Sequence, residues 1–281
     1  MIKYTKMHGC GNDYVYVDCM NGNIPSDPNG LSVRISDRHK GVGGDGLVLI
    51  CPSGKADAFM RMYNADGSEG RMCGNAIRCV GKYLFDRGIA VKEQIDVETL
   101  SGVKHLRMDV RDGCAVGATV DMGPAVFDCA SLPAKLEGEC VGSRISVAGG
   151  EYEVTLVSMG NPHCVVFCDD PEKLDTGKTG PMFEHDPLFP EGVNTEFVKK
   201  INDDTLLMRV WERGSGETFA CGTGACAAVS AAVRLGYFKK SEPVTVKLRG
   251  GDLVITYTDD AVYMTGEAVT VSDGVYYGDE Q

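Results

Sequence analysis

The sequence lacks the patterns of a membrane protein, a zinc protein and a dinucleotide-binding protein. No apolar run approaches the ~20 residues of a membrane-spanning helix. There is no C-x-x-C and no helical H-E-x-x-H, so the common zinc-ligand spacings are missing. The glycine-rich stretch at 41–46 precedes a strand pattern, whereas a dinucleotide fingerprint opens a helix. We therefore expect no metal and no cofactor.

Positive charge is also scarce. Lysine and arginine number 28 against 40 aspartates and glutamates, which gives a net charge of -12 at pH 7. An acidic chain repels the phosphate backbone, so we expect no nucleic-acid partner. The first six residues, Met1–Lys6, lack the apolar core of a signal peptide. We expect a cytoplasmic protein with no membrane partner.

Cysteine is abundant, at 12 residues, but its spacing does not indicate disulfides or metal. A cytoplasmic chain of this size keeps its thiols reduced. Most of the cysteines, such as Cys164, lie in apolar strand-like surroundings and behave as small buried hydrophobic residues. Cys73 and Cys221 are different because their local sequence occurs twice.

The repeat covers about half of the 281 residues. A shift of 148 positions places Cys73-Gly74-Asn75 on Cys221-Gly222-Thr223, residues 59–64 on 207–212, and Glu69 on Glu217. A shift of 149 positions places residues 11–17 on 160–166. Two related halves that face each other would put two equivalent cysteines across one cleft. We predict an N-terminal domain over 1–121, on which the tail 268–281 packs back, and a C-terminal domain over 122–267.

Both cysteines precede a predicted helix. Apolar residues recur at three- and four-residue spacing after each one, and the patterns stop at Gly88 and Gly236. Shorter alternating patterns predict strands, mainly antiparallel, around each helix. The predicted fold class is α+β, with two pseudo-symmetric domains, each a mixed, mainly antiparallel sheet wrapped around a central helix. Residues 30–38 form a further short helix, and residues 127–142 form a loop-rich join.

A helix N-terminus favours a thiolate and offers N–H groups to an anion. The glycine after each cysteine allows a ligand to approach closely. We predict that one cysteine removes the proton from an amino-acid α-carbon and that the other returns a proton to the opposite face. N–H groups around Gly74, Asn75, Gly222 and Thr223 would hold the neighbouring carboxylate.

Eight motifs resemble those of the diaminopimelate epimerases, in the same order along essentially the whole chain. They lie at 7–14, 37–46, 62–68, 72–76, 159–163, 192–196, 211–214 and 220–224. The resemblance implies the two-domain fold and the cofactor-independent interconversion of LL- and meso-2,6-diaminopimelate, in lysine and peptidoglycan-precursor biosynthesis. It implies Cys73 and Cys221 as the acid/base pair.

The resemblance also implies roles for other residues. His163 would lie near Cys73 and assist its ionisation, and Glu212 would support catalysis beside Cys221 or bind an ammonium group. Arg213 can hold a distal carboxylate with two donors. The predicted substrate-binding residues are Asn12, Asn64, Gly74, Asn75, Asn161, Asn194, Glu212, Arg213, Gly222 and Thr223. Glu69 and Glu217 are interpreted as loop or capping carboxylates outside the site.

Three alternatives remain open. A proline racemase or hydroxyproline epimerase also uses paired cysteines, but its cyclic substrate has no distal carboxylate for Arg213. A phenazine-biosynthesis isomerase lacks the cysteine pair. A non-enzymatic amino-acid-binding protein would bind its ligand without either thiol. The expected partner is a small-molecule amino acid, and a homodimer is the oligomer considered.

Overall fold

The computed structural model describes residues 1–278, which fall into two compact units. Unit 1 contains Met1–Val120 together with the chain from Thr265 onward, and unit 2 contains Asp121–Met264. The division into domains 1–121 and 122–267 stays a prediction, and its residues 279–281 lie outside the described part of the chain.

Unit 1 combines two helices with strands from both ends of the chain. Its elements are β1 (Ile2–Gly9), β2 (Asn12–Asp18), α1 (Pro28–Ser36), β3 (Gly46–Cys51), β4 (Ala58–Asn64), β5 (Glu69–Gly70), α2 (Gly74–Asp86), β6 (Gln94–Thr99), β7 (Gly102–Arg111), β8 (Cys114–Asp121) and β18 (Val269–Tyr276). Strand β18 pairs antiparallel with β1, and this pairing ties the end of the described chain to its beginning.

Unit 2 repeats this plan with its own elements. These are η1 (Cys129–Ser131), β9 (Ser143–Val147), β10 (Gly150–Ser158), β11 (Pro162–Phe167), η2 (Pro171–Lys173), α3 (Thr176–Glu184), β12 (Asn194–Lys200), β13 (Thr205–Glu212), β14 (Gly216–Glu217), α4 (Gly222–Arg234), β15 (Pro243–Leu248), β16 (Gly251–Tyr257) and β17 (Val262–Glu267). Strand β9 pairs with β10 as β18 pairs with β1 in unit 1.

The pairing pattern is the same in both units. In unit 1, β2 runs parallel to β3 and β4 runs parallel to β6, whereas the other pairs are antiparallel. In unit 2, the parallel pairs are β11 with β12 and β13 with β15. Parallel neighbours need a crossover connection. Helix α2 lies in the connection from β4 to β6, and α4 lies in the connection from β13 to β15.

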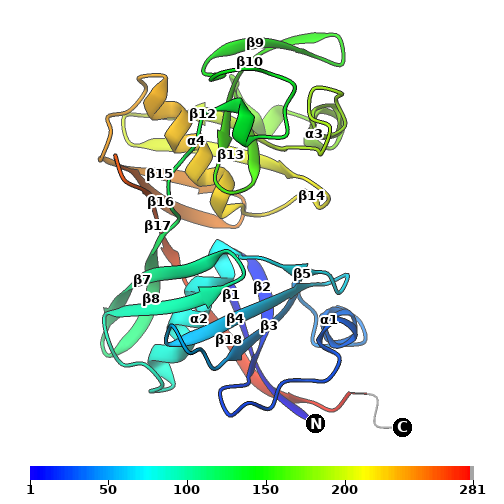
Figure 1. The fold of residues 1–281 in the computed structure, drawn as a ribbon, viewed down its shortest axis with the longest axis vertical. Coiled ribbons are helices and arrows are strands. Elements are labelled where there is room, and N and C mark those ends of the chain that lie inside the picture. The colour runs from blue at the N-terminus through cyan, green and yellow to red at the C-terminus, as the bar shows by residue number, and fades with distance from the viewer. Residues whose placement is uncertain (279–281) are drawn as a thin grey trace. The chain divides into compact units, whose positions relative to one another are not determined.

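Helices α2 and α4 are the central helices of the two units (Figure 1). Helix α2 packs on β1, β2, β6 and β7, and α4 packs on β10, β11, β12, β13, β15 and β16. Residues 74–81 of α2 and 224–232 of α4 are buried, because the strands cover each helix on several sides. The predicted fold class, with a central helix wrapped by a mainly antiparallel sheet, is confirmed.

Some element boundaries differ from the prediction. The first helix begins at Pro28, not Gly30, because the Asp27 side chain accepts a hydrogen bond from Gly30 N and caps it. The sequence analysis missed α3, whose Gly180 and Pro181 disfavour a helix in isolation. Packing explains this helix, because a side chain at Gly180 would overlap the Trp211 ring. The 127–142 segment is mostly irregular, as predicted, with one turn of 3-10 helix.

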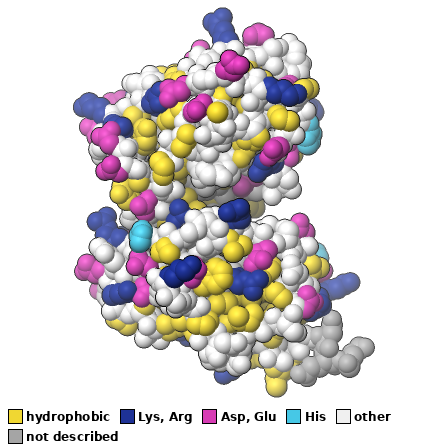
Figure 2. Space-filling view, viewed as in Figure 1, with side chains coloured by type: hydrophobic (Ala, Val, Ile, Leu, Met, Phe, Trp, Pro, Cys, Tyr) yellow, Lys and Arg dark blue, Asp and Glu magenta, His cyan; other side chains and the backbone are white. Residues whose placement is uncertain are grey.

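The surface shows acidic and basic side chains interspersed on the face of the described residues drawn in Figure 2. Within residues 1–278, no helix has the length and apolarity needed to cross a membrane.

Candidate functional site

Each of the two repeated cysteines is the residue immediately before a central helix. Cys73 precedes α2 and Cys221 precedes α4, and both have extended backbone angles (φ -132° and -119°). The extended conformation lets the following glycine begin the helix directly. In α4, the N–H of Gly224 donates to Cys221 Sγ at 3.4 Å, so a free N–H group of the first turn contacts the sulfur.

In unit 1, a cluster forms around Cys73 at the start of α2. The thiol donates to Asn12 Oδ1 at 3.3 Å, and Asn75 Nδ2 donates to the same oxygen at 3.3 Å. Cys73 is half-buried, whereas Gly74 and Asn75 are buried. The structure therefore brings together four predicted site residues on β2 and the first turn of α2.

Asp45 fixes the orientation of Asn12. Its Oδ2 accepts from Asn12 Nδ2 at 2.7 Å and from the Asp13 N–H at 3.1 Å, while its Oδ1 pairs with Arg38 Nη2 at 2.9 Å. Because the amide nitrogen is held by Asp45, the amide oxygen of Asn12 faces Cys73. Asp45 belongs to one of the motifs quoted above, but nothing in the sequence pointed to this contact.

Asn64 is exposed at the end of β4, where its Nδ2 donates to Ser68 Oγ at 2.9 Å. Gly46 lies opposite Asn64 in the β3–β4 pairing. A side chain at Gly46 would overlap the carbonyl oxygen of Tyr63, so glycine is required there. Gly46 consequently contributes backbone and no side chain to this end of the sheet.

In unit 2, Asn161 occupies the place that Asn12 has in unit 1. Its Nδ2 lies 3.3 Å from Thr223 Oγ1, on the first turn of α4, and its Oδ1 lies 3.0 Å from His163 Nε2. The other ring nitrogen, Nδ1, lies 2.7 Å from Glu196 Oε1. Both ring nitrogens of His163 are thus engaged within unit 2, and its predicted effect on Cys73 stays a prediction.

The Cys221 thiol is a much weaker acid than a free cysteine. Burial raises its pKa well above the ordinary value, and the carboxylates of Glu212 and Glu196 raise it further, against hydrogen bonds from Thr223 and Gly224 that lower it. The helix N-terminus was expected to favour the thiolate, but here desolvation and the two carboxylates outweigh it. These surroundings favour the protonated thiol of Cys221 over the thiolate.

Glu212 lies beside that thiol at the end of β13. Burial raises its pKa, against hydrogen bonds from Thr218 and Cys221 that lower it. The Thr218 hydroxyl donates to Glu212 Oε1, and this contact holds the carboxylate against the loop that leads to α4. The structure thus places Glu212 next to Cys221, and its role in catalysis stays a prediction.

Asn194 connects β12 to the loop that carries Arg213. It is 5% exposed, its Nδ2 donates to the Pro162 carbonyl at 2.7 Å, and its Oδ1 accepts from the Arg213 N–H at 3.0 Å. The Arg213 side chain is exposed and donates through Nη1 to the Glu191 carbonyl at 3.0 Å. Asn194 therefore links the Pro162 carbonyl to the Arg213 N–H within unit 2, and these two hydrogen bonds are called the Asn194 bracket below. The Arg213 guanidinium is accessible.

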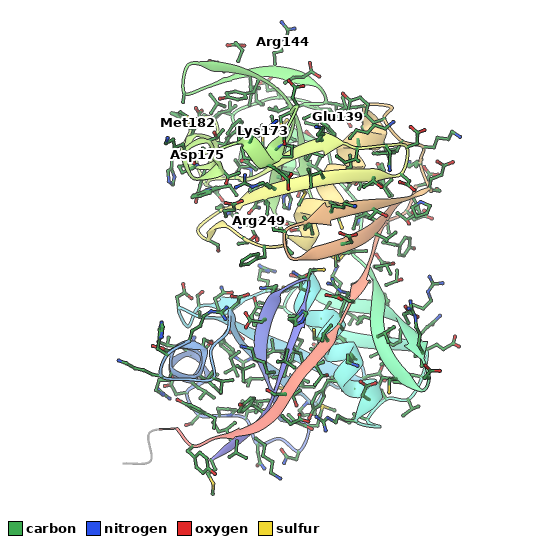
Figure 3. All side chains as sticks on the ribbon, turned by 180° about the vertical axis from the view of Figure 1, so that it is seen from behind. Glu139, Arg144, Lys173, Asp175, Met182 and Arg249 are labelled. Atoms are coloured by element: carbon green, nitrogen blue, oxygen red, sulfur yellow. The ribbon has the colours of Figure 1, made fainter. Side chains whose placement is uncertain are left out.

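The loops before the two helices are held by equivalent ion pairs. Arg61 Nε lies 2.9 Å from Glu69 Oε1, and Arg209 Nε lies 2.7 Å from Glu217 Oε1. Arg249, labelled in Figure 3, adds a second partner to Glu217 at 3.2 Å. Glu69 and Glu217 thus brace the loops, which agrees with their interpretation as loop carboxylates.

Among residues 1–278, no group of three or more His, Cys, Asp or Glu side chains has the arrangement of a metal site. What the clusters offer instead is a thiol, backbone N–H groups and amides at the start of each central helix. These groups can hold a carboxylate and exchange a proton with an adjacent carbon.

Comparison with known sequences gives one consistent result. The family profile described as diaminopimelate epimerase matches residues 4–127 and 155–271. Diaminopimelate epimerase of Desulfovibrio desulfuricans is 52% identical over 98% of both chains. That of Acetivibrio thermocellus is 50% identical over 97% of this chain and 98% of its own.

Comparison with solved structures reports on the fold. A hydroxyproline epimerase from Agrobacterium vitis matches with a TM-score of 0.70 at 17% identity, over 99% of this chain and 93% of its own. A probable proline racemase from Agrobacterium radiobacter matches with a TM-score of 0.72 at 16% identity, over 99% and 94%. At such low identity these structures share the fold with this chain, and they do not decide its substrate.

Proposed function

The chain belongs to the diaminopimelate epimerase family, and we propose that it interconverts LL- and meso-2,6-diaminopimelate without a cofactor. The observation that carries the proposal is the pair of equivalent cysteines, each at the start of a central helix in its own unit. The product would serve lysine and peptidoglycan-precursor biosynthesis.

In the proposed mechanism, Cys73 and Cys221 are the two catalytic residues. One sulfur, as thiolate, takes the α-proton, and the other, as thiol, gives its proton to the opposite face of the carbon. The proton count of the enzyme is unchanged, but the two thiols exchange roles in each turnover. The raised pKa of Cys221 supports Cys221 as the thiol in the ligand-free protein.

The negative charge formed on removal of the α-proton spreads into the neighbouring carboxylate. Backbone N–H groups at the first turns of α2 and α4, around Gly74, Asn75, Gly222 and Thr223, would stabilise that charge. Amides suit a substrate with two ammonium and two carboxylate groups, because they donate and accept without adding net charge. We assign this role to Asn12, Asn64, Asn161 and Asn194.

Supporting roles fall to three side chains of unit 2. We propose that Glu212 acts beside Cys221 or binds an ammonium group, and that His163 assists ionisation of Cys73. Arg213 would bind the distal carboxylate. Its exposed guanidinium, which donates through Nη1 to the Glu191 carbonyl oxygen, supports this assignment. We further propose a cytoplasmic enzyme with a small amino acid as its partner, and a possible homodimer.

The experiment follows the α-hydrogen of LL-diaminopimelate by proton NMR in deuterated buffer. Reduced wild-type protein should exchange this hydrogen for deuterium and yield the meso isomer, with no added pyridoxal phosphate or metal. Exchange of proline or hydroxyproline, with none of diaminopimelate, would assign the chain to the racemase group instead. Binding of diaminopimelate without any exchange would favour a binding protein.

A further inference from the structure

A histidine and a glutamate are completely buried together beneath the first turn of α4. His163 on β11 and Glu196 on β12 both have 0% exposure, and Nδ1 lies 2.7 Å from Oε1. Burying a carboxylate is costly unless it is paired and hydrogen-bonded. The family resemblance gave a role to His163 but none to Glu196.

Glu196 touches the helix that begins at Cys221. A Cβ added to Gly224 would lie 2.6 Å from Glu196 Oε1, so the carboxylate fills the space under the first turn of α4. Its second oxygen, Oε2, is buried and has no hydrogen-bond partner among the described residues. His163 thus engages only one of the two carboxylate oxygens, and the carboxylate lies close enough to Cys221 to raise the pKa of its thiol.

The other ring nitrogen of His163 contacts one of the predicted substrate-binding residues, Asn161. Its Nε2 lies 3.0 Å from Asn161 Oδ1, and Asn161 Nδ2 lies 3.3 Å from Thr223 Oγ1. Since Glu196 engages Nδ1, it fixes the ring, and Nε2 is left to orient the Asn161 amide. Removal of Glu196 would free both the ring and the amide.

The repeat shows that this pair is particular to one unit. The residue 148 positions before Glu196 is Val48, and the residue 149 positions before His163 is Tyr14. Strand β2 pairs with β3 in the same register as β11 with β12: Tyr16 lies opposite Val48, and Val165 lies opposite Glu196. The Cys73 cluster therefore has an apolar residue at the place where the Cys221 cluster has a carboxylate.

We propose that Glu196 is a positioning residue of this enzyme, which holds the His163 ring and favours the protonated form of Cys221 in the resting state. The inference rests on the proposed two-cysteine function and adds an asymmetry to it: of the two cysteines, Cys221 holds its proton more tightly in the resting state. Glu196 needs no contact with substrate for this role, because it acts through His163 and through its charge.

Several titratable groups share the field of Glu196. Burial raises the pKa of Cys221 and the charges of Glu212 and Glu196 add to it, and burial also raises the pKa of Glu212. On β11, burial raises the pKa of Cys164, with a further contribution from Glu196. Loss of the Glu196 charge should therefore lower the pH at which Cys221 ionises, while the nearby Glu212 charge keeps part of the effect.

The test compares E196Q with T195V in the reduced, full-length protein. Glutamine keeps the shape and can accept from Nδ1–H, but removes the charge. Thr195 is the neighbouring buried residue, and its Oγ1 is a buried atom without a hydrogen-bond partner among the described residues, so T195V controls for a polar change in the same strand. The readout is the pH dependence of iodoacetamide alkylation, resolved by peptide mapping into Cys73 and Cys221.

In the wild type and in T195V, we expect the alkylation midpoint of Cys221 to lie above that of Cys73. In E196Q, the Cys221 midpoint should move to lower pH, so that its alkylation near pH 8 rises at least threefold while that of Cys73 changes less than twofold. The alkaline limb of kcat should move in the same direction, with KM changed less than kcat. A purely structural role for Glu196 would lower Tm and leave the midpoints unchanged.

Two results would overturn the proposal. The first is a Cys221 midpoint in folded E196Q that coincides with the wild-type midpoint. The second, which needs no variant, is a wild-type midpoint for Cys221 below that of Cys73, and it decides the matter should E196Q not fold. Both results can be told apart from a failure of the proposed function, because alkylation requires no turnover. The proposed function itself would fail if the wild type did not exchange the α-hydrogen.

Discussion

Replacement of Arg213 by alanine tests whether this side chain binds the distal carboxylate of the substrate. The Arg213 side chain is exposed and donates to the Glu191 carbonyl, while its backbone N–H is held by Asn194 Oδ1. Truncation of the side chain leaves the backbone bracket intact, so the free energy of unfolding should change by less than about 1 kcal/mol. Any large kinetic effect then reports on substrate.

The magnitude follows from the bond that is lost. A guanidinium can give a carboxylate two parallel, charge-assisted hydrogen bonds, and loss of both should cost about 2 to 4 kcal/mol. This corresponds to roughly a 30- to 1000-fold lower kcat/KM, mainly through KM if the contact is the same in the ground and transition states. Arg213→Lys should recover only part of the loss, because an ammonium is a point charge without the fork.

The assay measures kcat/KM for LL-diaminopimelate and, in parallel, α-hydrogen exchange with lysine, which lacks the distal carboxylate. The wild type and Arg213→Ala should differ strongly with the first substrate and little with the second. Arg144→Ala is the matched control, since Arg144 is an exposed arginine on β9 of the same unit (Figure 3). If kcat/KM of Arg213→Ala stays within about threefold of the wild type, the distal carboxylate is bound elsewhere.

Two further predictions concern the thiols and the Asn194 bracket. Either Cys73→Ala or Cys221→Ala should abolish inversion. The activity of the wild type should have a bell-shaped dependence on pH, in which the acid limb reports protonation of the thiolate base. The alkaline limb reports loss of the Cys221 proton, and the raised pKa of Cys221 moves this limb to higher pH. Near-normal racemisation by either single variant would refute a two-base mechanism. Asn194→Ala should lower the free energy of unfolding by about 2 kcal/mol, because it leaves the buried Pro162 carbonyl and the Arg213 N–H without this partner. Urea unfolding measures the loss. A change below about 0.5 kcal/mol would contradict a stabilising role for these two hydrogen bonds.

The fold was predictable where local patterns and the repeat agreed. The apolar spacing after Cys73 and Cys221 located α2 and α4, and alternation located most central strands. Elements that depend on distant partners were missed. Helix α3 contains Gly180 and Pro181 and owes its place to the Trp211 ring. Strand β18 is largely exposed; the tail 268–281 was expected to pack on the N-terminal domain, but its pairing with β1 as a strand was not predicted. Neither contact leaves a local signature.

The candidate site divides in the same way. The motifs indicated which residues matter, but they did not indicate which atoms meet. Asp45 holds Asn12 from 33 residues away, and Glu196 holds His163 from the same separation. The sequence did not indicate which cysteine keeps its proton, because the helix N-terminus is a local feature that both share, whereas the burial of Cys221 and the Glu196 carboxylate come from packing.

The positions at which the repeat breaks carry the chemical differences between the two units. Cysteine, the following glycine and the asparagine on the facing strand are repeated, as Cys73 with Cys221 and Asn12 with Asn161. These residues suit proton transfer at an α-carbon, whose two faces demand the same groups. Three charged residues of unit 2 are not repeated: Glu196 corresponds to Val48, and shifts of 148 place Asn64 on Glu212 and Ala65 on Arg213. A substrate with a reacting end and a distal end needs such an asymmetry, and a small cyclic imino acid does not. These three breaks, with the charge in unit 2, are therefore consistent with the proposed diaminopimelate substrate.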